Sequence, residues 1–357
     1  MTRGDEMNWS RAILHLDMDA FYVNVHILDH PDDKGIPLIV GGQPDQRGVV
    51  ASASYEARAR GIRSAMPCSQ AVRLCPQVKI VPANWPRIHE CSAQVMAILE
   101  EYGPVEKMSV DEAYVDLSEQ EYPEEVVRKV QTAVHSQTRL PCSVGLATSK
   151  LVAKVASDHD KPQGCTVVPP GSEATFMAPL STRAIWGIGP KTAEKLTALG
   201  IQNCGQLATA DLGQLQAVLG KLAAELQQRA QGIDPRPVQP YYGPPQSISQ
   251  EWTFNNDIND RAVLLRQLEK MCQSVARSLQ KRQLSARTVY VKFRWADFTT
   301  FTRQKSVTVT IDSDVEIYRL AVAIWEENWP PGQRMRLLGV GVSNLEEASV
   351  RQLGFGF

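Results

Sequence analysis

Four acidic side chains lie in two short segments of the chain. Asp17 and Asp19 follow an apolar run that starts at residue 11, and Asp111 and Glu112 are adjacent in Ser-Val-Asp-Glu-Ala-Tyr. Carboxylates are oxygen ligands that Mg²⁺ prefers, and two such ions can stabilise the attacking and leaving oxygens of a phosphoryl displacement. A solvated Asp-Glu pair at a turn is the simpler interpretation of Asp111 and Glu112. Asp17 at the end of an apolar strand is harder to explain in that way.

The hydrophobic pattern predicts a sheet that brings these acids together. Strand, helix, hairpin, helix and strand are expected over residues 11–17, 88–102, 105–117, 126–134 and 142–147. This order is the split βαβ plan of ferredoxin-like sheets, with residues 21–86 as an insertion. Adjacent strand residues point to opposite faces, so Asp111 and Glu112 can converge near Asp17 only if the hairpin turn lies beside them. Three clustered carboxylates would repel one another unless cations lay among them.

The rest of the chain divides into three further segments. Residues 173–231 are expected to be all helical, and five prolines between Asp234 and Pro245 indicate an extended tether. Residues 247–345 repeat the β-α-β-β-α-β order without repeating the sequence. We therefore expect a multidomain α+β protein.

Composition excludes several classes of protein. The 357 residues carry a net charge of −1 and are 43% hydrophobic, and no apolar run approaches the roughly 20 residues of a membrane helix. A cytoplasmic protein without a membrane segment is expected, with its seven scattered cysteines reduced. The charge is unevenly distributed. Residues 1–160 hold 16 Lys and Arg against 22 Asp and Glu, whereas residues 181–357 hold 21 against 16.

Several motifs in register along the chain resemble those of the Y-family DNA polymerases. They are Leu-Asp-Met-Asp-Ala-Phe-Tyr at 16–22, Ala-Ser-Tyr-Glu-Ala-Arg at 53–58 with Gly-Ile-Arg-Ser-Ala-Met-Pro at 61–67, Ser-Val-Asp-Glu-Ala-Tyr-Val-Asp at 109–116, and Ala-Ser-Asp-His-Asp-Lys-Pro-Gln-Gly at 156–164. The resemblance implies a low-fidelity, template-directed translesion polymerase that adds deoxynucleotides to a primer 3′-hydroxyl with two Mg²⁺ ions.

The same resemblance implies a division into domains. A ferredoxin-like palm would span residues 1–20 and 84–172, and inserted fingers 21–83. An all-α helix-hairpin-helix thumb would span 173–232, a linker 233–246, a βαββαβ little finger 247–348, and a clamp-binding tail 349–357. One alternative is a catalytically altered DNA-binding protein of the same fold, against which the intact acids argue. Another is a nucleotide cyclase, against which the thumb motif and the basic C-terminal domain argue. No exonuclease motif is evident, so proofreading is not expected.

Roles for the catalytic residues follow only from the resemblance. The metal ligands would be Asp17, Asp111, Glu112 and the Met18 carbonyl, while Asp19 and Asp116 would be structural or solvated. Tyr22 would be a steric gate against ribonucleotides, assisted by the Phe21 backbone; a core aromatic is the alternative.

The nucleotide pocket is completed by two further groups of residues. Tyr55, Arg58 and Lys161 would bind the triphosphate, and Gly42, Val49 and Ala51 would form a small-residue roof that tests base-pair shape weakly. The segment Val23-Asn24-Val25-His26 departs from the family's usual Ala-Ser-Val-Glu, which puts local hydrogen bonding around His26 in doubt.

DNA contacts are expected from the second half of the chain. In Trp-Gly-Ile-Gly-Pro-Lys, the residues Gly187, Gly189 and Lys191 resemble a helix-hairpin-helix grip on the DNA backbone, although a plain turn is the alternative. In the C-terminal domain the basic residues of the expected hairpin would follow duplex phosphates, unless they form an ordinary solvated surface. These residues are Arg287, Lys292, Arg294, Arg303 and Lys305.

The chain ends in a sequence that resembles a sliding-clamp-binding peptide. Its residues would be Gln352, Leu353, Phe355 and Phe357, and a tail without a partner is the alternative. The expected partners are primer–template DNA, a deoxynucleoside triphosphate and the clamp, with the protein itself a monomer.

Overall fold

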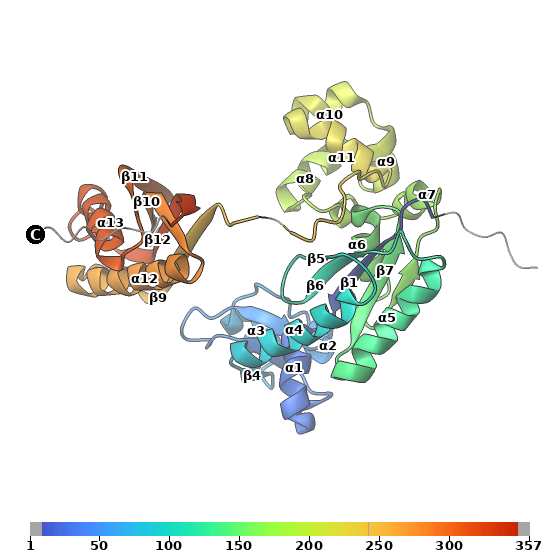
Figure 1. Ribbon diagram of the computed structural model, residues 1–357, viewed down its shortest axis with the longest axis horizontal. Coiled ribbons are helices and arrows are strands. Elements are labelled where there is room, and N and C mark those ends of the chain that lie inside the picture. Colours follow the sequence, from blue (N-terminus) through green and yellow to red (C-terminus); the bar gives the residue numbers. More distant parts are fainter. Residues whose placement is uncertain (1–8, 242, 349–357) are drawn as a thin grey trace, which may run out of the picture. The chain divides into compact units, whose positions relative to one another are not determined.

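The computed structural model describes residues 9–241 and 243–348. The chain divides between Tyr241 and Tyr242 into two compact units, which are considered separately. Figure 1 labels their helices and strands. No helix in the described residues is both long and apolar enough to cross a membrane.

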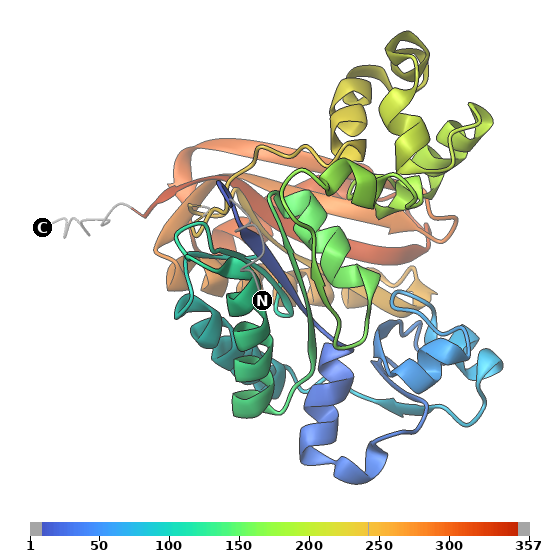
Figure 2. The same cartoon turned by 90° about the vertical axis from the view of Figure 1, so that its right-hand side faces the viewer.

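The first unit is built on a five-stranded sheet. Its order is β5-β6-β1-β7-β8, and the strands span Val105–Lys107, Glu112–Asp116, Ile13–Met18, Cys142–Ala147 and Cys165–Val167. Strand β1, dark blue in Figure 2, lies in the middle and pairs antiparallel with both β6 and β7. The expected hairpin is therefore β5-β6, and the strand order is that of a ferredoxin-like sheet with β8 added.

Helices cover both faces of this sheet because β1 is apolar on both. Leu14 and Leu16 pack against the helices α4 (Trp85–Glu100) and α5 (Pro123–Thr138). Ile13, from the opposite face of β1, packs against α6 (Lys150–His159). Strand alternation then places His15 and Asp17 on the α6 side. Helix α6 thus covers the face of β1 that carries Asp17.

A small domain is inserted between β1 and α4. Its three-stranded sheet has the order β3-β2-β4, with strands at Val50–Ala53, Leu38–Gly41 and Lys79–Val81. The helical segments α1, η1, α2 and α3 accompany it, over Phe21–Asp29, Pro31–Asp33, Tyr55–Ala59 and Cys68–Leu74. Buried Ala20 and Val23 pack against Leu38 and Val40, which joins the start of the insertion to its sheet.

The segment after β8 is helical, as its sequence predicts. It contains α7, η2, α8, α9, α10, η3 and α11, over Glu173–Met177, Thr182–Ala184, Pro190–Ala198, Cys204–Thr209, Leu212–Leu219, Gly220–Leu222 and Ala223–Ala230. Beyond it, residues 234–239 are attached to the first sheet domain. The Arg11 side chain donates to the Asp234 carbonyl at 2.9 Å, and the Gln239 amide donates to Glu106 Oε2 at 2.7 Å. Part of the expected tether is therefore held by specific hydrogen bonds.

The second unit is a βαββαβ domain. Its sheet has the order β11-β10-β12-β9, with strands at Thr300–Ile311, Leu284–Trp295, Met335–Glu347 and Ser247–Ile258. Helices α12 (Arg261–Lys281) and α13 (Asp314–Asn328) pack on one face, around Phe293, Trp325 and Leu338. The second β-α-β-β-α-β order predicted from the sequence is confirmed.

Candidate active site

The acidic residues meet where β1 ends beside the β5-β6 hairpin. Asp17 on β1 lies directly opposite Glu112 on β6 in the antiparallel register. Asp111 immediately precedes β6, and its carbonyl accepts a hydrogen bond from the Met18 amide at 3.0 Å. The hairpin turn therefore lies where the convergence of Asp111 and Glu112 with Asp17 requires it.

Two lysines from α6 and the loop that follows it pair with these carboxylates. Lys161 Nζ lies 2.6 Å from Asp17 Oδ2, and Lys154 Nζ lies 2.7 Å from Glu112 Oε2. Lys161 also pairs with Asp158 at 2.8 Å. Cations thus compensate the clustered acids, as their mutual repulsion requires.

The two paired carboxyls have opposite pKa shifts. Burial raises the pKa of Asp17 to about 7, against the opposing effect of Lys161. The proximity of His15, and then the Lys154 ammonium, hold the pKa of Glu112 well below its ordinary range. Burial lowers the pKa of Lys161, but Asp17 and Asp158 outweigh that effect, and its pKa is raised overall.

Most of the predicted nucleotide-binding residues line one cavity of about 200 Å³, here called the Asp17 cavity. Its lining includes Asp17, Met18, Phe21, Tyr22, Ala51, Tyr55, Arg58, Asp111 and Lys161. These residues come from β1, α1, β3, α2, the β5-β6 turn and the loop after α6. The fold therefore joins motifs that are up to 144 positions apart in the sequence.

Tyr22 forms one side of the Asp17 cavity. Its ring meets the Trp85 ring edge-on, with centroids 5.6 Å apart, and the Phe21 ring at 5.8 Å. Burial, followed by the charge of Asp111, raises the pKa of the Tyr22 hydroxyl. The side chain is only partly buried, so a ring that borders the cavity suits it better than the alternative of a core aromatic.

Tyr55 and Arg58 share one face of α2, as their spacing predicts. The Arg58 guanidinium lies 4.9 Å from the centre of the Tyr55 ring. The Tyr55 hydroxyl donates to Asp19 Oδ1 at 3.0 Å. Asp19 is buried and also accepts hydrogen bonds from the Ser143 hydroxyl and the Gln163 amide. These contacts give Asp19 a structural part in the wall of the Asp17 cavity.

The three predicted roof residues have different positions. Ala51 lines the Asp17 cavity, whereas Gly42 and Val49 lie beyond its lining. Gly42 and Val49 are joined by a hydrogen bond from the Gly42 amide to the Val49 carbonyl at 3.3 Å. A side chain at Gly42 would meet the Gly48 backbone at 2.7 Å, so the close approach of these two loop segments requires glycine.

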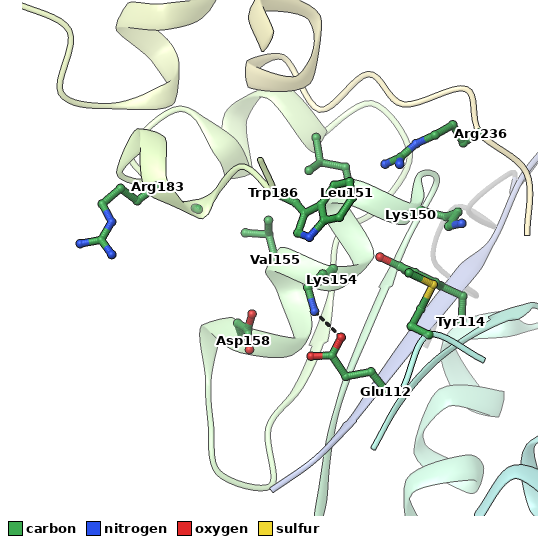
Figure 3. Close-up of a pocket in the computed structure, with 12 residues that line it drawn as sticks. Glu112, Tyr114, Lys150, Leu151, Lys154, Val155, Asp158, Arg183, Trp186 and Arg236 are labelled. Carbon is green, nitrogen blue, oxygen red and sulfur yellow. Dashed lines mark hydrogen bonds and ion pairs between the residues drawn. The ribbon is translucent and has the colours of Figure 1, made fainter. Parts of the chain in front are cut away.

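Glu112 differs from the other acids in the space that it faces. It lines a second cavity, of about 220 Å³, shown in Figure 3 and here called the Glu112 pocket. Lys154 and Trp186 also line this pocket. Neither Lys154 nor His15 was predicted as part of the site. Spacing along the chain gave no signal for either residue, because their contacts with Glu112 depend on how α6 and β1 pack.

The donor set suits a hard divalent cation. Asp17, Met18 and Asp111 line one cavity, with no Cys or His on its lining. Within residues 9–241 and 243–348, however, no three acidic, His or Cys side chains are gathered closely enough to hold an ion. The three predicted carboxylates are thus adjacent but not assembled, because Lys154 and Lys161 hold two of them.

The glycine-rich segment before α8 has the geometry of a helix start. Gly187 has φ +100°, a conformation that favours glycine, and Gly189 is the N-cap residue of α8. Lys191 lies in the exposed first turn of that helix. Arg229 from α11 donates to the Trp186 carbonyl at 3.2 Å and so holds this segment against the helical domain.

The basic residues of the second unit lie on two faces of its sheet. Lys292 and Arg294 pair with Thr302 and Thr300, whereas Arg303 and Lys305 pair with the buried Val291 and Val289. The second pair therefore lies on the face covered by helices.

Ion pairs agree with this placement. Lys305 reaches Glu327 on α13 at 2.5 Å. Lys292 instead crosses Gly339 of β12 to reach Glu251 on β9 at 2.7 Å. Each predicted pair does share a face, but the four residues do not form one basic surface. Arg287 is paired with Glu346 at 2.6 Å. The proposed clamp residues Gln352, Leu353, Phe355 and Phe357 lie outside the described residues.

Comparison with known proteins agrees with the geometry. Residues 16–158 match the impB/mucB/samB family, residues 245–355 match the C-terminal domain of that family, and residues 183–234 match the thumb domain of DNA polymerase-iota. DNA polymerase IV from Halorhodospira halophila is 39% identical over 345 residues, which cover 95% of this chain and 96% of the relative. DNA polymerase IV from Dehalococcoides mccartyi is also 39% identical, over 94% of this chain and 87% of the relative.

Solved structures extend the likeness to the fold. A Y-family DNA polymerase chimera superposes with a TM-score of 0.82 at 26% identity, covering 93% of this chain and 98% of the other. DinB from Sulfolobus solfataricus has a TM-score of 0.64 at the same identity and coverage. The chain therefore belongs to the Y family of DNA polymerases, as a translesion enzyme that uses divalent metal ions and acts on primer–template DNA and nucleotides.

Proposed function

We propose that nucleotidyl transfer takes place in the Asp17 cavity, with Asp17, Asp111, Glu112 and the Met18 carbonyl as ligands of two Mg²⁺ ions. The observation that carries the proposal is the shared lining of this cavity, on which Asp17 and Asp111 lie together with the cationic Arg58 and Lys161. Bound Mg²⁺ would supply Lewis-acid activation of the primer 3′-hydroxyl and neutralise charge on the triphosphate.

The cationic residues bind and orient the nucleotide. Arg58 offers a planar fork of donors suited to phosphate oxygens, and Tyr55 adds a hydroxyl. Lys161 exchanges its pairing with Asp17 for the triphosphate, which leaves that carboxylate free for metal. The raised pKa of Lys161 keeps its ammonium charged throughout.

The remaining wall selects the sugar and tolerates imperfect base pairs. Tyr22 packs below the deoxyribose and collides with a 2′-hydroxyl, while Ala51 contributes little bulk above the base. Gly42 and Val49 would reach the base pair only with substrate bound. A small roof discriminates weakly by shape, which is the physical basis proposed for low fidelity and lesion bypass.

DNA is held by two further surfaces. Gly187, Gly189 and Lys191 at the start of α8 contact backbone phosphates, and Lys292 with Arg294 follows them from the open face of the second unit. The proposed palm, fingers, thumb, linker, little finger and tail keep the residue limits given in the sequence analysis. A DNA-binding protein that has lost catalysis is not favoured, because the acidic residues and the triphosphate-binding residues are all present.

The C-terminal peptide would dock on a sliding clamp through Gln352, Leu353, Phe355 and Phe357, with the polymerase acting as a cytoplasmic monomer. Deletion of residues 352–357 should abolish stimulation of synthesis by the clamp and leave basal extension unchanged. Equal loss of both activities would contradict this role.

The polymerase proposal is tested by single-nucleotide extension of a primer on undamaged and lesion-containing templates. Synthesis should stop when EDTA removes divalent ions and return when Mg²⁺ is added. Extension that continues in EDTA would contradict the proposal.

A further inference from the structure

The Glu112 pocket is lined by the β5-β6 hairpin, α6 and the start of the helical domain (Figure 3). Glu112 in its lining directly follows Asp111, which lines the Asp17 cavity. Two cations of the Glu112 pocket are already engaged: Lys150 pairs with buried Glu106 at 2.5 Å, and Arg236 pairs with Asp234 at 2.8 Å. Arg183 lines the pocket, and no ion pair joins its guanidinium to any residue that the structure describes. Arg183 is therefore available to an incoming anion, and Lys154 becomes available only by exchange of its partner Glu112.

Glu112 is directed into this pocket by Lys154. Figure 3 shows the carboxylate beside the Lys154 ammonium, and their atoms are 2.7 Å apart. Asp17, Met18 and Asp111 line the Asp17 cavity, and Glu112 is absent from that lining. The ion pair thus keeps one acid of the proposed ligand set away from the other two.

A buried histidine lies near the Glu112 carboxylate, beyond hydrogen-bond distance. His15 Nε2 is buried without a hydrogen-bond partner and lies 3.8 Å from Glu112 Oε2. His15 Nδ1 lies 2.7 Å from the Ser157 hydroxyl, whose own proton is donated to the Lys154 carbonyl at 2.8 Å. Nδ1 is thus engaged with Ser157, and Nε2 lies beyond hydrogen-bond distance of the carboxylate. Of these two neighbours, Lys154 is the one within hydrogen-bond distance of Glu112.

We propose that Lys154 is a positioning residue that holds Glu112 in the Glu112 pocket until a phosphodiester of the primer strand enters and takes over Lys154, so that DNA binding completes the carboxylate site. Arg183 would be the second contact to that phosphodiester. The inference rests on the proposed ligand roles of Asp17, Asp111 and Glu112.

The exchange is physically accessible. The Lys154 and Glu112 side chains are 22% and 30% exposed, so the pair borders solvent and an incoming phosphate can reach the ammonium. A phosphodiester is a charged acceptor that can replace the carboxylate on the ammonium. Once released, Glu112 needs only side-chain rotation to approach Asp17, because the two residues are already opposite each other on paired strands.

The test uses Mn²⁺ as the probe and electron paramagnetic resonance of free Mn²⁺ as the readout, with the full-length protein. Titrations are made without DNA, with dideoxy-terminated primer–template, with single-stranded template, and with inorganic phosphate. Binding by DNA alone is measured and subtracted. In the wild type, primer–template should raise Mn²⁺ affinity about 10-fold, within the range usual for coupled sites. Template or phosphate alone should not.

Lys154→Met should release Glu112 without DNA. Its DNA-free affinity for Mn²⁺ should rise about 10-fold, and primer–template should then add less than about 3-fold. Lys154→Arg should behave as the wild type because the ion pair can reform. A matched control is Lys129→Met, which removes an exposed lysine paired with Glu125 at 3.6 Å on α5 and should change neither value.

Results that contradict the role of Lys154 differ from those that contradict the proposed metal ligands. The inference is wrong if Lys154→Met has wild-type affinity without DNA, if primer–template raises affinity equally in both proteins, or if inorganic phosphate reproduces the gain. The proposed ligand set is wrong if Asp111→Ala leaves Mn²⁺ affinity unchanged. Melting temperatures of all variants check that each is folded.

Discussion

Asp17 and Glu112 lie directly opposite each other on β1 and β6, yet their carboxylates pair with different lysines and face different cavities. The strand register fixes their backbones, while Lys161 and Lys154 determine the directions of their side chains. The proposed active site is therefore preformed in its backbone and charge-compensated in its side chains. Substrates that carry negative charge are the natural competitors for both lysines.

Replacement of Tyr22 by Ala should admit ribonucleotides. The partly buried ring would no longer collide with a ribose 2′-hydroxyl, so discrimination between deoxyribonucleotides and ribonucleotides should fall by at least about 100-fold. The measurement is the ratio of kcat/KM for the two nucleotides in primer extension. Tyr22→Phe, which keeps the ring, should retain selectivity, and unchanged selectivity in Tyr22→Ala would remove the steric-gate role.

Replacement of Asp19 by Ala should destabilise the first unit. Its buried carboxylate accepts hydrogen bonds from Tyr55, Ser143 and Gln163, and their loss should cost about 3 kcal/mol of unfolding free energy. Urea unfolding monitored by tryptophan fluorescence measures this. The exposed Asp45 provides a control, whose substitution by Ala should have little effect. Equal stability of the two variants would contradict a structural role for Asp19.

Replacement of Asp33 by Asn tests the region where His26 departs from the family pattern. Asp33 pairs with Lys79 at 2.6 Å and with His26 at 2.8 Å, and these partners hold its pKa below the ordinary value of 3.8. A lowered carboxyl pKa stabilises the fold above that ordinary value, and the contribution disappears as pH falls through the lowered pKa. The variant should therefore melt below the wild type at pH 7, and the difference should disappear in strong acid.

Thermal melts across this pH range provide the test. Replacement of the neighbouring Asp32 by Asn is a matched control, because Asp32 is exposed in the same short helix. A difference between Asp33→Asn and the wild type that stays constant from pH 7 to strong acid would contradict the linkage.

Substitution of two lysines on the β10-β11 hairpin tests which face of the sheet contacts DNA. Lys292 lies on the open face of the sheet and Lys305 on the helix-covered face, and each has one acidic partner. Lys292→Ala should weaken DNA binding several-fold and reduce the slope of log affinity against log salt by about 1. Lys305→Ala should leave both values unchanged. Equal effects of the two substitutions in fluorescence anisotropy would contradict the assignment of the open face.

Much of this architecture follows from local pattern. Alternating and helical spacing of apolar residues is enough to predict both βαββαβ domains. The same pattern predicts a hairpin turn before Glu112. The position of Asp17 beside that turn then depends only on the strand order of a ferredoxin-like sheet. Such features are predictable because each is determined by burial of one face of a strand or helix.

Features that depend on register between distant elements were not predicted. Lys154 reaches Glu112 because α6 packs on the β1 face that carries His15 and Asp17. The spacing of residues along the chain does not predict which face of the sheet α6 covers. The two faces of the β10-β11 hairpin were predictable in principle, since Val289, Val291 and Phe293 mark the buried side of β10. Pairing across the short turn then places Arg303 opposite Val291.

The central claim is that the acids at the end of β1 and in the β5-β6 turn perform nucleotidyl transfer. The most direct measurement is the rate of Mg²⁺-dependent single-nucleotide extension by the wild type, Asp111→Ala and Glu112→Ala. Both substitutions should reduce the rate by at least about 1000-fold, or about 4 kcal/mol of transition-state stabilisation. Asp116→Asn on the same strand, whose carboxylate accepts hydrogen bonds from Ser118, should extend at the wild-type rate. Wild-type rates in Asp111→Ala and Glu112→Ala would contradict the account.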